Sequence, residues 1–267
     1  MAEVRSIFIT GGGSGIGRAT AQLFAGRGWR VGLADVNAAG LAETRELLPE
    51  GMAETYHMDV RDRDAWVASL DGFTSTTGGR LDVLHNNAGI GTGGPLAEAS
   101  FDDIDRTVAI NLMGVINGAR IGYDYLARTP GSCLLNTASA SAIYGSAGLA
   151  PYSATKFGVR ALTEALDGEW ARAGVDGTGI KVRSIVPSFI ETPLLSGTAG
   201  NHTIRERVVA AGMELTPVEA VAQAAWDAVH GDQVHTYVGK TAHKLRFAAR
   251  WFPGSLRKRM RRGFREE

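Results

Sequence analysis

An α/β fold is predicted by this sequence of 267 residues: one parallel sheet of about seven strands with helices on both faces. Short apolar runs rich in β-branched residues alternate with longer segments of helical periodicity, an alternation typical of βαβ units. Glycine-rich turns follow three of these runs, at residues 11–17, 89–94 and 145–148. Because neither composition nor a repeat marks a boundary, we expect a single domain.

The predicted strands are bounded by turn-forming residues and are separated by the predicted helices. The strands cover residues 6–10, 30–34, 53–58, 81–86, 132–137, 181–186 and 234–238. The helices cover residues 17–26, 38–48, 63–75, 101–127, 152–173 and 217–229. Ligands of an open parallel sheet bind beyond the carboxyl ends of its strands, so the glycine-rich turns lie where a ligand would approach.

Composition and charge exclude several classes of protein. Hydrophobic residues make up 44% of the chain, charged residues 21%, and the formal net charge is zero, as expected of a globular protein that is not, as a whole, a nucleic-acid binder. The single cysteine, Cys133, permits no internal disulfide and fits a reducing compartment. We find no signal peptide and no apolar run near the ~20 residues that span a bilayer, and expect a cytoplasmic protein.

The charge is unevenly distributed along the chain. Residues 240–267 hold ten basic and two acidic residues, a net charge of +8, and the remainder carries −8. This extension follows a predicted domain of residues 1–239 that carries both the cofactor and the substrate site. Its mixture of aromatic and basic residues is typical of a helix that makes weak peripheral contact with an anionic membrane. A solvated or subunit-contacting helix is the first alternative, and a nucleic-acid arm the second.

The glycine-rich segment of residues 10–17 follows the first predicted strand and opens the first helix. Glycines allow a tight turn and let backbone amides approach a pyrophosphate, and the helix N-terminus adds unpaired N–H groups and a favourable dipole. The segment therefore predicts a dinucleotide site. Its predicted contacts are Gly11, Ser14, Gly15, Ile16 and Gly17.

Asp35 predicts which dinucleotide binds. It ends the second predicted strand, eighteen residues after Gly17, where a carboxylate can accept hydrogen bonds from the adenosine ribose hydroxyls. A carboxylate would repel a 2′-phosphate, so NAD is favoured over NADP. Arg18 points the other way, since a basic residue could hold that phosphate. Its place in the first helical turn favours a solvated or structural role.

Tyr152 and Lys156 predict a proton-transfer centre. They stand four residues apart in a predicted helix, with Ser139 thirteen positions before the tyrosine. Residues i and i+4 share a helix face, and an ammonium there would lower the phenol pKa from ~10. Such a tyrosine can take a proton from an alcohol or give one to a carbonyl. The six histidines show no metal-ligand spacing, so no metal is expected.

Together these motifs resemble the short-chain dehydrogenase/reductase superfamily in its single-domain form. The resemblance rests on the glycine segment, Asn86-Asn87-Ala88-Gly89, Asn111, Ser139 and the tyrosine–lysine pair, and runs from about residue 4 to 239. It implies a doubly wound Rossmann-type sheet, hydride transfer between a nicotinamide cofactor and an alcohol or ketone, and a homodimer or homotetramer formed through helices near residues 101–127 and 152–173.

The resemblance also assigns roles to single residues. It implies that Asn111 holds a water in a proton relay, that Ser139 binds the substrate oxygen, that Tyr152 is the acid/base and that Lys156 binds the nicotinamide ribose. Further implied cofactor contacts border the adenine, line the adenosine side and clamp the carboxamide. They are Asp59 and Val60; Asn87, Ala88 and Gly89; and Pro187, Ile190 and Thr192. Ser188 departs from the family, which usually has glycine there.

The substrate is predicted less closely. Expected contacts are Ser139, Ser141, Tyr144, Leu149 and Tyr152, and residues 192–213 form either a lid or an ordinary loop before a helix. Apolar residues at 143, 149, 194 and 195 favour a lipid-like or steroid-like secondary alcohol. Two other functions stay open: an NADPH-dependent carbonyl or 3-oxoacyl-thioester reductase, and a non-catalytic dinucleotide sensor. Asp35 argues against the first, and the retained Tyr152 and Lys156 against the second.

Overall fold

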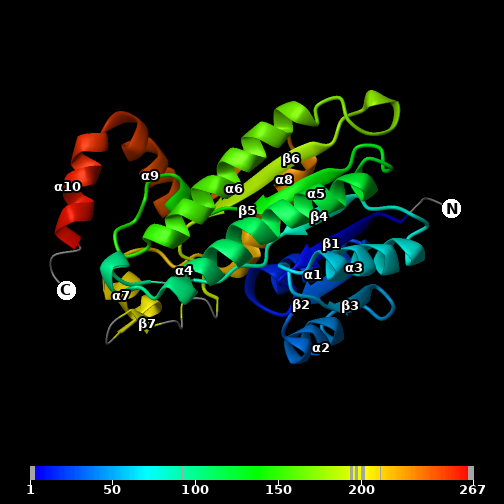
Figure 1. Cartoon of the computed structure of the whole chain (residues 1–267), viewed down its shortest axis with the longest axis horizontal. Helices are drawn as coiled ribbons and strands as arrows, with labels where there is room; N and C mark the ends of the chain where they lie inside the picture. Colours follow the sequence, from blue (N-terminus) through cyan, green and yellow to red (C-terminus); the bar gives the residue numbers. More distant parts are fainter. Residues whose placement is uncertain are drawn as a thin grey trace.

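A seven-stranded parallel sheet forms the centre of the computed structural model (Figure 1). The structure describes residues 4–91, 93–192, 195, 198–199, 202–210 and 212–263. The strand order is β3-β2-β1-β4-β5-β6-β9. The bounds are β1 (Ser6–Thr10), β2 (Arg30–Asp35), β3 (Ala53–His57), β4 (Val83–Asn86), β5 (Cys133–Thr137), β6 (Lys181–Pro187) and β9 (His235–Val238). The predicted fold class is thereby confirmed.

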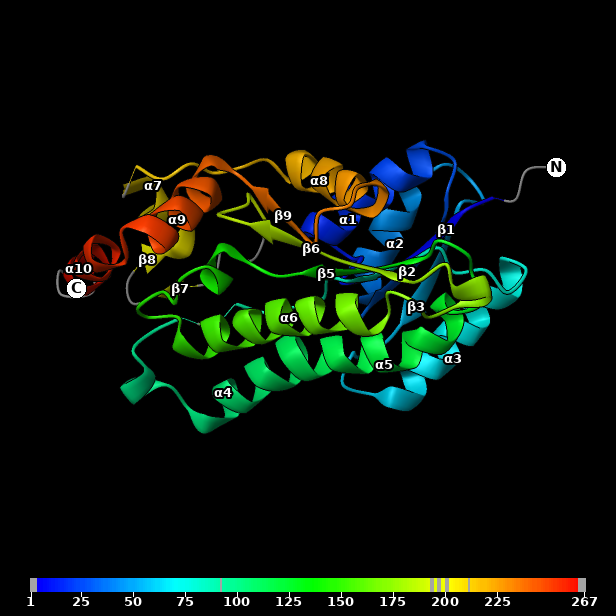
Figure 2. The same cartoon turned by 90° about the horizontal axis from the view of Figure 1, so that it is seen from above.

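Helices cover both faces of the sheet, as Figure 2 shows: α1, α2 and α8 lie on one face, and α3 to α6 on the other. The bounds on the first face are α1 (Gly15–Gly26), α2 (Ala38–Glu46) and α8 (Val218–His230). On the second they are α3 (Arg63–Thr76), α4 (Phe101–Val108), α5 (Gly114–Leu126) and α6 (Ala150–Glu169). Each face has its own aromatic cluster. Phe24 packs 5.1 Å from Trp29 on the first face, and Phe8 packs 5.6 Å from Phe73 on the second, between ring centroids.

Smaller elements complete the described chain. The antiparallel pair β7 (Thr198–Ala199) and β8 (His202–Thr203) precedes α7 (Ile204–Ala210). The helices α9 (Lys240–Trp251) and α10 (Pro253–Gly263) follow β9. Short 3-10 turns are η1 (Leu96–Glu98), η3 (Ala140–Ala142) and η4 (Val175–Gly177). Among the described residues, no helix has the length and apolar character needed to cross a bilayer.

One predicted element differs in the structure. The helix expected over residues 101–127 is divided into α4 and α5 by a π-helical turn, η2 (Ala109–Met113). Single π-turns inside α-helices frequently occur at functional sites, and this one carries Asn111, which is fully buried. Apolar periodicity did not predict the turn, because one inserted residue shifts the apolar pattern at a single point within an otherwise helical segment.

The sheet reverses its direction of growth at β1, which pairs with β2 on one side and β4 on the other. From β1 the chain first adds β2 and β3, and then returns to add β4, β5, β6 and β9 on the opposite side. A crevice forms beyond the carboxyl ends of strands at such a switch point. The predicted site residues belong to the segments that border this crevice.

Candidate active site

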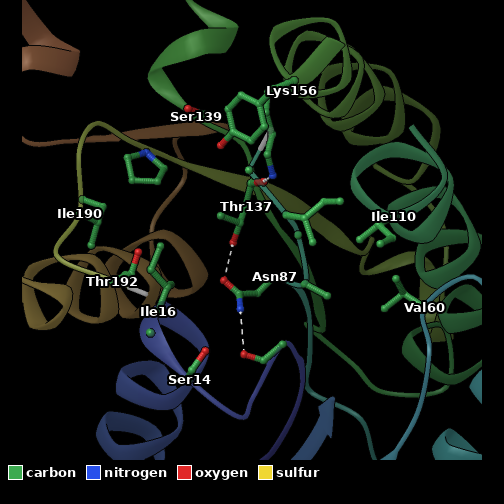
Figure 3. Close-up of a pocket in the computed structure, with 18 of the residues that line it drawn as sticks. Ser14, Ile16, Val60, Asn87, Ile110, Thr137, Ser139, Lys156, Ile190 and Thr192 are labelled. Carbon is green, nitrogen blue, oxygen red and sulfur yellow. Dashed lines mark hydrogen bonds between the residues drawn. The ribbon is translucent and has the colours of Figure 1, made fainter. Parts of the chain in front are cut away.

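A pocket of about 570 Å³ opens beyond the carboxyl ends of the strands. Figure 3 shows Ser139 and Lys156 at one end, Ser14 and Ile16 at the other, and Asn87 and Thr137 between them. Most of the predicted cofactor residues line it. They are Gly11, Ser14, Gly15, Ile16, Asp35, Asp59, Val60, Asn87, Ala88, Gly89, Tyr152, Lys156, Pro187, Ile190 and Thr192. The predicted substrate residues Ser139, Ser141 and Leu149 line it as well.

The glycine turn, at the Ser14 end of the pocket, is tightly packed against its own backbone. Gly11 has φ +68°, a backbone conformation that favours glycine. A Cβ on Gly17 would overlap the Gly11 carbonyl oxygen, so Gly17 shapes the turn from behind and does not line the pocket. Ser14 precedes α1 and makes no capping hydrogen bond with its side chain. The turn leaves the helix N-terminus facing the pocket, which fits a pyrophosphate.

Asp35 connects the end of β2 to this turn. One carboxylate oxygen accepts the Gly13 N–H at 2.9 Å, and the other accepts the Asn37 N–H at 3.0 Å. Each carboxylate oxygen has a second lone pair, so Asp35 retains acceptor capacity toward a ribose while it holds the turn. The position is the one expected for recognition of the adenosine.

The basic side chains near Asp35 have partners of their own. The Arg18 guanidinium donates to the Gly13 carbonyl at 2.6 Å and to Glu43 at 2.8 Å, which agrees with the structural role expected for it. Arg61 donates to both carboxylate oxygens of Asp59, and this pairing holds the pKa of Asp59 below its ordinary value. Arg106 lines the pocket and is exposed.

The end of the pocket opposite the glycine turn holds Ser139, Tyr152 and Lys156. Tyr152 lies in the first turn of α6, Lys156 one turn later, and Ser139 just after β5. The Lys156 Nζ donates to the Thr137 carbonyl at 2.9 Å and lies 5.7 Å from the Tyr152 ring centre. The Ser139 Oγ accepts the Ser141 N–H at 3.2 Å. A hydroxyl pair and a buried ammonium thus meet at one point.

Burial changes the proton affinity of both groups. It raises the pKa of Tyr152 above its ordinary value, although a hydrogen bond from Ser139 lowers it. Burial also lowers the pKa of Lys156 to about 8. The sequence predicted a lowered tyrosine pKa, and this is wrong for the chain by itself because desolvation of the phenolate is the larger effect. At neutral pH, Tyr152 is therefore a protonated donor.

A hydrogen-bonded network ties the two ends of the pocket together (Figure 3). The Thr137 Oγ1 donates to the Asn87 Oδ1 at 3.2 Å. The Asn87 Nδ2 donates to the Thr10 carbonyl at 3.0 Å. The Thr10 hydroxyl in turn accepts the N–H groups of Asn87 and Ala88. These bonds connect the ends of β1, β4 and β5, so they fix the pocket floor.

His85 supports the network from inside the sheet. Its Nε2 lies 2.9 Å from the Thr137 Oγ1, and because that hydroxyl donates to Asn87, the imidazole is the donor here. Burial lowers the pKa of His85 to about 3, so the ring is neutral. Neither His85 nor Thr137 was predicted from the sequence. The sequence did contain a signal for them: His85 is a polar residue within an apolar strand, and Thr137 is a polar residue at the end of another.

Besides Gly17, two predicted site residues do not line the pocket. The Asn111 side chain exchanges two hydrogen bonds of 2.8 Å with the backbone of Ile90, so it holds the loop after β4 and does not line the pocket. Tyr144 borders a second pocket, together with Phe157, Arg257 and Met260. The physical reason is that η3 turns the chain away from the substrate side after Ser141.

The predicted clamp and lid follow β6. Ile190 is buried and forms a bridge with Thr216, and Thr192 and Leu195 line the pocket. Ser188 donates its N–H to the Val238 carbonyl at 3.1 Å. The lid proposed over residues 192–213 includes positions 193, 194, 196, 197, 200, 201 and 211, which lie outside the described residues. The remainder forms the β7–β8 pair and α7.

Comparisons with known proteins agree with this geometry. A model of the short chain dehydrogenase family matches residues 5–202. The chain belongs to this family. Among curated members it is similar to meso-2,3-butanediol dehydrogenase of Serratia marcescens, 34% identical over 219 residues that cover 81% of this chain and 84% of the relative. It is 35% identical over 195 residues to the 3-oxoacyl-[acyl-carrier-protein] reductase FabG of Thermotoga maritima, covering 72% and 76%.

Solved structures of short-chain dehydrogenases are similar to this chain over most of its length. A short-chain dehydrogenase/reductase from Burkholderia phymatum in complex with NAD aligns with a TM-score of 0.82, at 25% identity over 97% of each chain. A 3-ketoacyl-(acyl-carrier-protein) reductase from Brucella melitensis with NADH aligns with a TM-score of 0.78, at 28% identity over 90% of this chain and 99% of that one. The predicted superfamily is confirmed, and the chain is an oxidoreductase of that family.

Proposed function

We propose that this short-chain dehydrogenase transfers a hydride between NAD(H) and an apolar secondary alcohol or ketone. One observation carries the proposal. Ser139, Tyr152 and Lys156 converge at one end of a pocket whose other end presents a glycine turn and Asp35. The nicotinamide cofactor supplies or accepts the hydride when it is bound, and the protein supplies position and proton transfer.

The proposed mechanism follows from the protonation states. Ser139 and Tyr152 hydrogen-bond the substrate oxygen. In ketone reduction, Tyr152 gives its proton to that oxygen. In alcohol oxidation, it takes the hydroxyl proton. Because burial raises the tyrosine pKa, the proton-donating role is available at neutral pH, and the oxidative role grows as the pH rises. General acid–base catalysis of this kind contributes ~10²–10⁴-fold.

Lys156 and Asn111 have supporting roles in this proposal. The Lys156 ammonium, held by the Thr137 carbonyl, is placed to bind a nicotinamide ribose and to favour the tyrosinate when it forms. Asn111 holds the loop at Ile90 that borders the pocket. A water held in a proton relay at Asn111 stays a prediction from family resemblance.

NAD is the proposed cofactor because Asp35 faces the adenosine end and the basic groups beside it are engaged. Arg18 and Arg61 are both committed to carboxylates. Asp35→Asn should weaken NAD binding and reduce the preference for NAD over NADP. The asparagine keeps an oxygen that can accept the Gly13 N–H but lacks the negative charge. Asp124→Asn, an exposed change on α5, is the matched control. Tighter NADP than NAD binding by the unaltered protein in a titration would overturn this assignment.

Reduction of a carbonyl or 3-oxoacyl thioester with NADPH is the second candidate. The exposed Arg106 lines the pocket and could meet a 2′-phosphate, and the similarity to FabG favours the thioester. The same titration separates the two candidates. A preference for NADPH that is lost in Arg106→Gln would select this second function.

An apolar substrate is proposed from the pocket walls near Ser139. Leu149, Phe189 and Leu195 line the same pocket as Ser139. The expected contact Ile143 does not line the pocket, and Leu194 lies outside the described residues. A panel of secondary alcohols graded in size and polarity tests the idea, because kcat/KM should rise with apolar surface.

We also propose a cytoplasmic homodimer or homotetramer. Exposed apolar side chains lie along α4 to α6, including Phe101 at 83% and Phe157 at 42% exposed. Members of this family are typically oligomeric, and burial of such side chains against a second copy would be favourable. Sedimentation velocity should give a dimer or tetramer, and a monomer at micromolar concentration would exclude both.

A further inference from the structure

The helices α9 and α10 form a pair, here called the C-terminal helix pair (residues 240–263), at one end of the molecule. Figures 1 and 2 show the pair at the end opposite the N-terminus, with α10 outermost. It is attached by few side chains: Ala242 is fully buried and Leu256 nearly so. His243 and Arg246 contact Tyr237, and Met260 borders the second pocket, but much of the rest of the pair is exposed.

Three large aromatic side chains are exposed where the two helices join. Phe247 is 59% exposed, Trp251 61% and Phe252 55%. The rings of Phe247 and Phe252 lie 5.9 Å apart, so they form one patch and not scattered contacts. Exposed patches of this kind mark surfaces that bind a partner or a membrane. Trp and Phe are also the side chains that insert at a bilayer interface.

The patch is surrounded by positive charge. Residues 240–263 contain nine basic residues and no acidic one. Lys240 meets Glu214 at 3.8 Å, and Arg250 lies over the Trp251 ring at 5.3 Å. Within the described part of the chain, no carboxylate pairs with Lys258 or Arg259. Lys258 and Arg259 are therefore available to meet an external anion.

The uneven charge of the chain would orient the protein at an anionic surface. Residues 240–267 carry a net +8 and the remainder −8. An anionic surface would attract the helix pair and repel the body, so the protein would meet it with α9 and α10 first. A bilayer satisfies both features at once, because anionic headgroups lie beside apolar chains.

We propose that the C-terminal helix pair binds the protein to the surface of an anionic lipid bilayer. Phe247, Trp251 and Phe252 would enter the interface, and the surrounding Lys and Arg side chains would contact headgroups. The pair begins directly after β9, at the sheet edge that carries the pocket, and α10 also borders the second pocket with Tyr144 and Phe157. Membrane binding would thus present the active-site edge to a lipid phase. That last consequence rests on the proposed apolar substrate, whereas the binding itself does not.

The test is co-sedimentation of the full-length protein with sucrose-loaded vesicles. One set contains phosphatidylcholine with 30–40% phosphatidylglycerol (about this fraction, to give a strongly anionic surface), and the other phosphatidylcholine alone. We expect binding to the first set that falls as salt increases. Lys258→Gln/Arg259→Gln should weaken it by about tenfold or more, since each cation near an anionic surface contributes several-fold. Phe247→Ser/Trp251→Ser should weaken it similarly.

Matched controls remove the same groups elsewhere. Arg45→Gln/Arg172→Gln deletes two exposed charges from the body, and Leu47→Ser deletes one exposed apolar side chain; both should bind as the unaltered protein does. Unchanged NAD(H) binding shows that each variant is folded. The proposal would be overturned if the protein did not bind vesicles, or if the control and test variants lost binding equally. It would also be overturned if the same residues mediated self-association or binding to a nucleic-acid duplex without vesicle binding. None of these outcomes depends on which substrate the active site uses.

Discussion

The two walls of the pocket are built differently. Around Asn87 and Thr137, hydrogen bonds connect the ends of neighbouring strands, and Lys156 is bound to the Thr137 carbonyl, although the buried Nδ1 of His85 has no partner among the described residues. Around Ser188, two buried hydroxyls, those of Ser188 and Thr216, have no hydrogen-bond partner among the described residues. The first wall is fixed by bonds that no ligand needs to supply. The second is shaped by close packing.

Gly239 explains the second wall. It has φ +87°, and a Cβ there would overlap the Ser188 Oγ and lie 2.6 Å from the Thr216 Oγ1. The serine that replaces the family's usual glycine is therefore accommodated by a glycine 51 positions later in the sequence. The hydrogen-bonded wall suits the proposed proton transfer. The closely packed wall suits the segment that is proposed to hold the cofactor carboxamide. The predictions below test this difference, beginning with the largest effect.

Tyr152→Phe should lower turnover by about 10²–10⁴-fold, because it removes the proton donor from the fixed wall and leaves the ring. Cofactor affinity should change little. Steady-state rates with the best substrate of the alcohol panel measure the effect. The control is Tyr144→Phe, which removes the same atom at the second pocket and should stay near the original activity. Equal turnover by Tyr152→Phe and the unaltered protein would remove the assigned role.

Gly239→Ala should destabilise the protein by about 2–4 kcal/mol, since backbone strain at positive φ adds to overlap with Ser188. Gly131→Ala is the control, because Gly131 also has positive φ and open space around it. Urea unfolding should show the larger loss for residue 239. Adding Ser188→Gly should restore part of the loss. Equal losses in the two alanine variants would break the link between Gly239 and Ser188.

Thr137→Val should cost about 1–3 kcal/mol, because it leaves His85 and Asn87 without their shared hydroxyl inside the protein. NAD binding should weaken as well, since Asn87 lines the pocket. Urea unfolding and a cofactor titration measure the two effects. Thr178→Val, at an exposed position, serves as the control and should change neither. A neutral result at residue 137 would show that the network does not fix the wall.

A pH dependence of stability is expected as well. The pKa of Lys156 is about 8 in the folded protein and ~10.4 in an unfolded chain, so the unfolded state binds more protons between these values. The contribution of Lys156 to the free energy of unfolding should therefore increase by on the order of 1–3 kcal/mol as the pH rises from about 8 to 10.

Comparison with Lys156→Met isolates this contribution. The difference in unfolding free energy between the two proteins should grow in favour of the unaltered one over that interval. Lys258→Met, at an exposed lysine, should show no such trend. A difference that stays constant with pH would mean that Lys156 is not desolvated. Above pH ~10 the raised pKa of Tyr152 acts in the opposite direction, because the unfolded state then loses its proton first.

The fold and much of the site could be predicted because their signals are local. Strand and helix periodicity is carried by neighbouring residues, and the glycine turn, Asp35 and the Tyr152–Lys156 pair stand at short spacings along the chain. The carboxyl ends of parallel strands meet at one edge. Placing these residues at strand ends was therefore sufficient to bring them into one pocket.

Other parts of the site depend on contacts between distant residues. The bond between Thr137 and Asn87 joins residues fifty positions apart, and no local pattern encodes it. The bond between Asn111 and Ile90 joins the π-turn to the loop after β4, 21 positions earlier, and no local pattern encodes it. The raised pKa of Tyr152 reflects burial, which a spacing argument does not measure. Tyr144 was misplaced because the direction of η3 was unknown.

The central claim is that this pocket transfers hydride with NAD. Turnover of an apolar ketone with NADH that carries deuterium at both positions of nicotinamide C4 tests it most directly, with the product examined by mass spectrometry. We predict an alcohol that carries one deuterium on the carbinol carbon, formed faster with NADH than with NADPH. Absence of label from the alcohol, or absence of turnover across the whole panel with both cofactors, would contradict the claim.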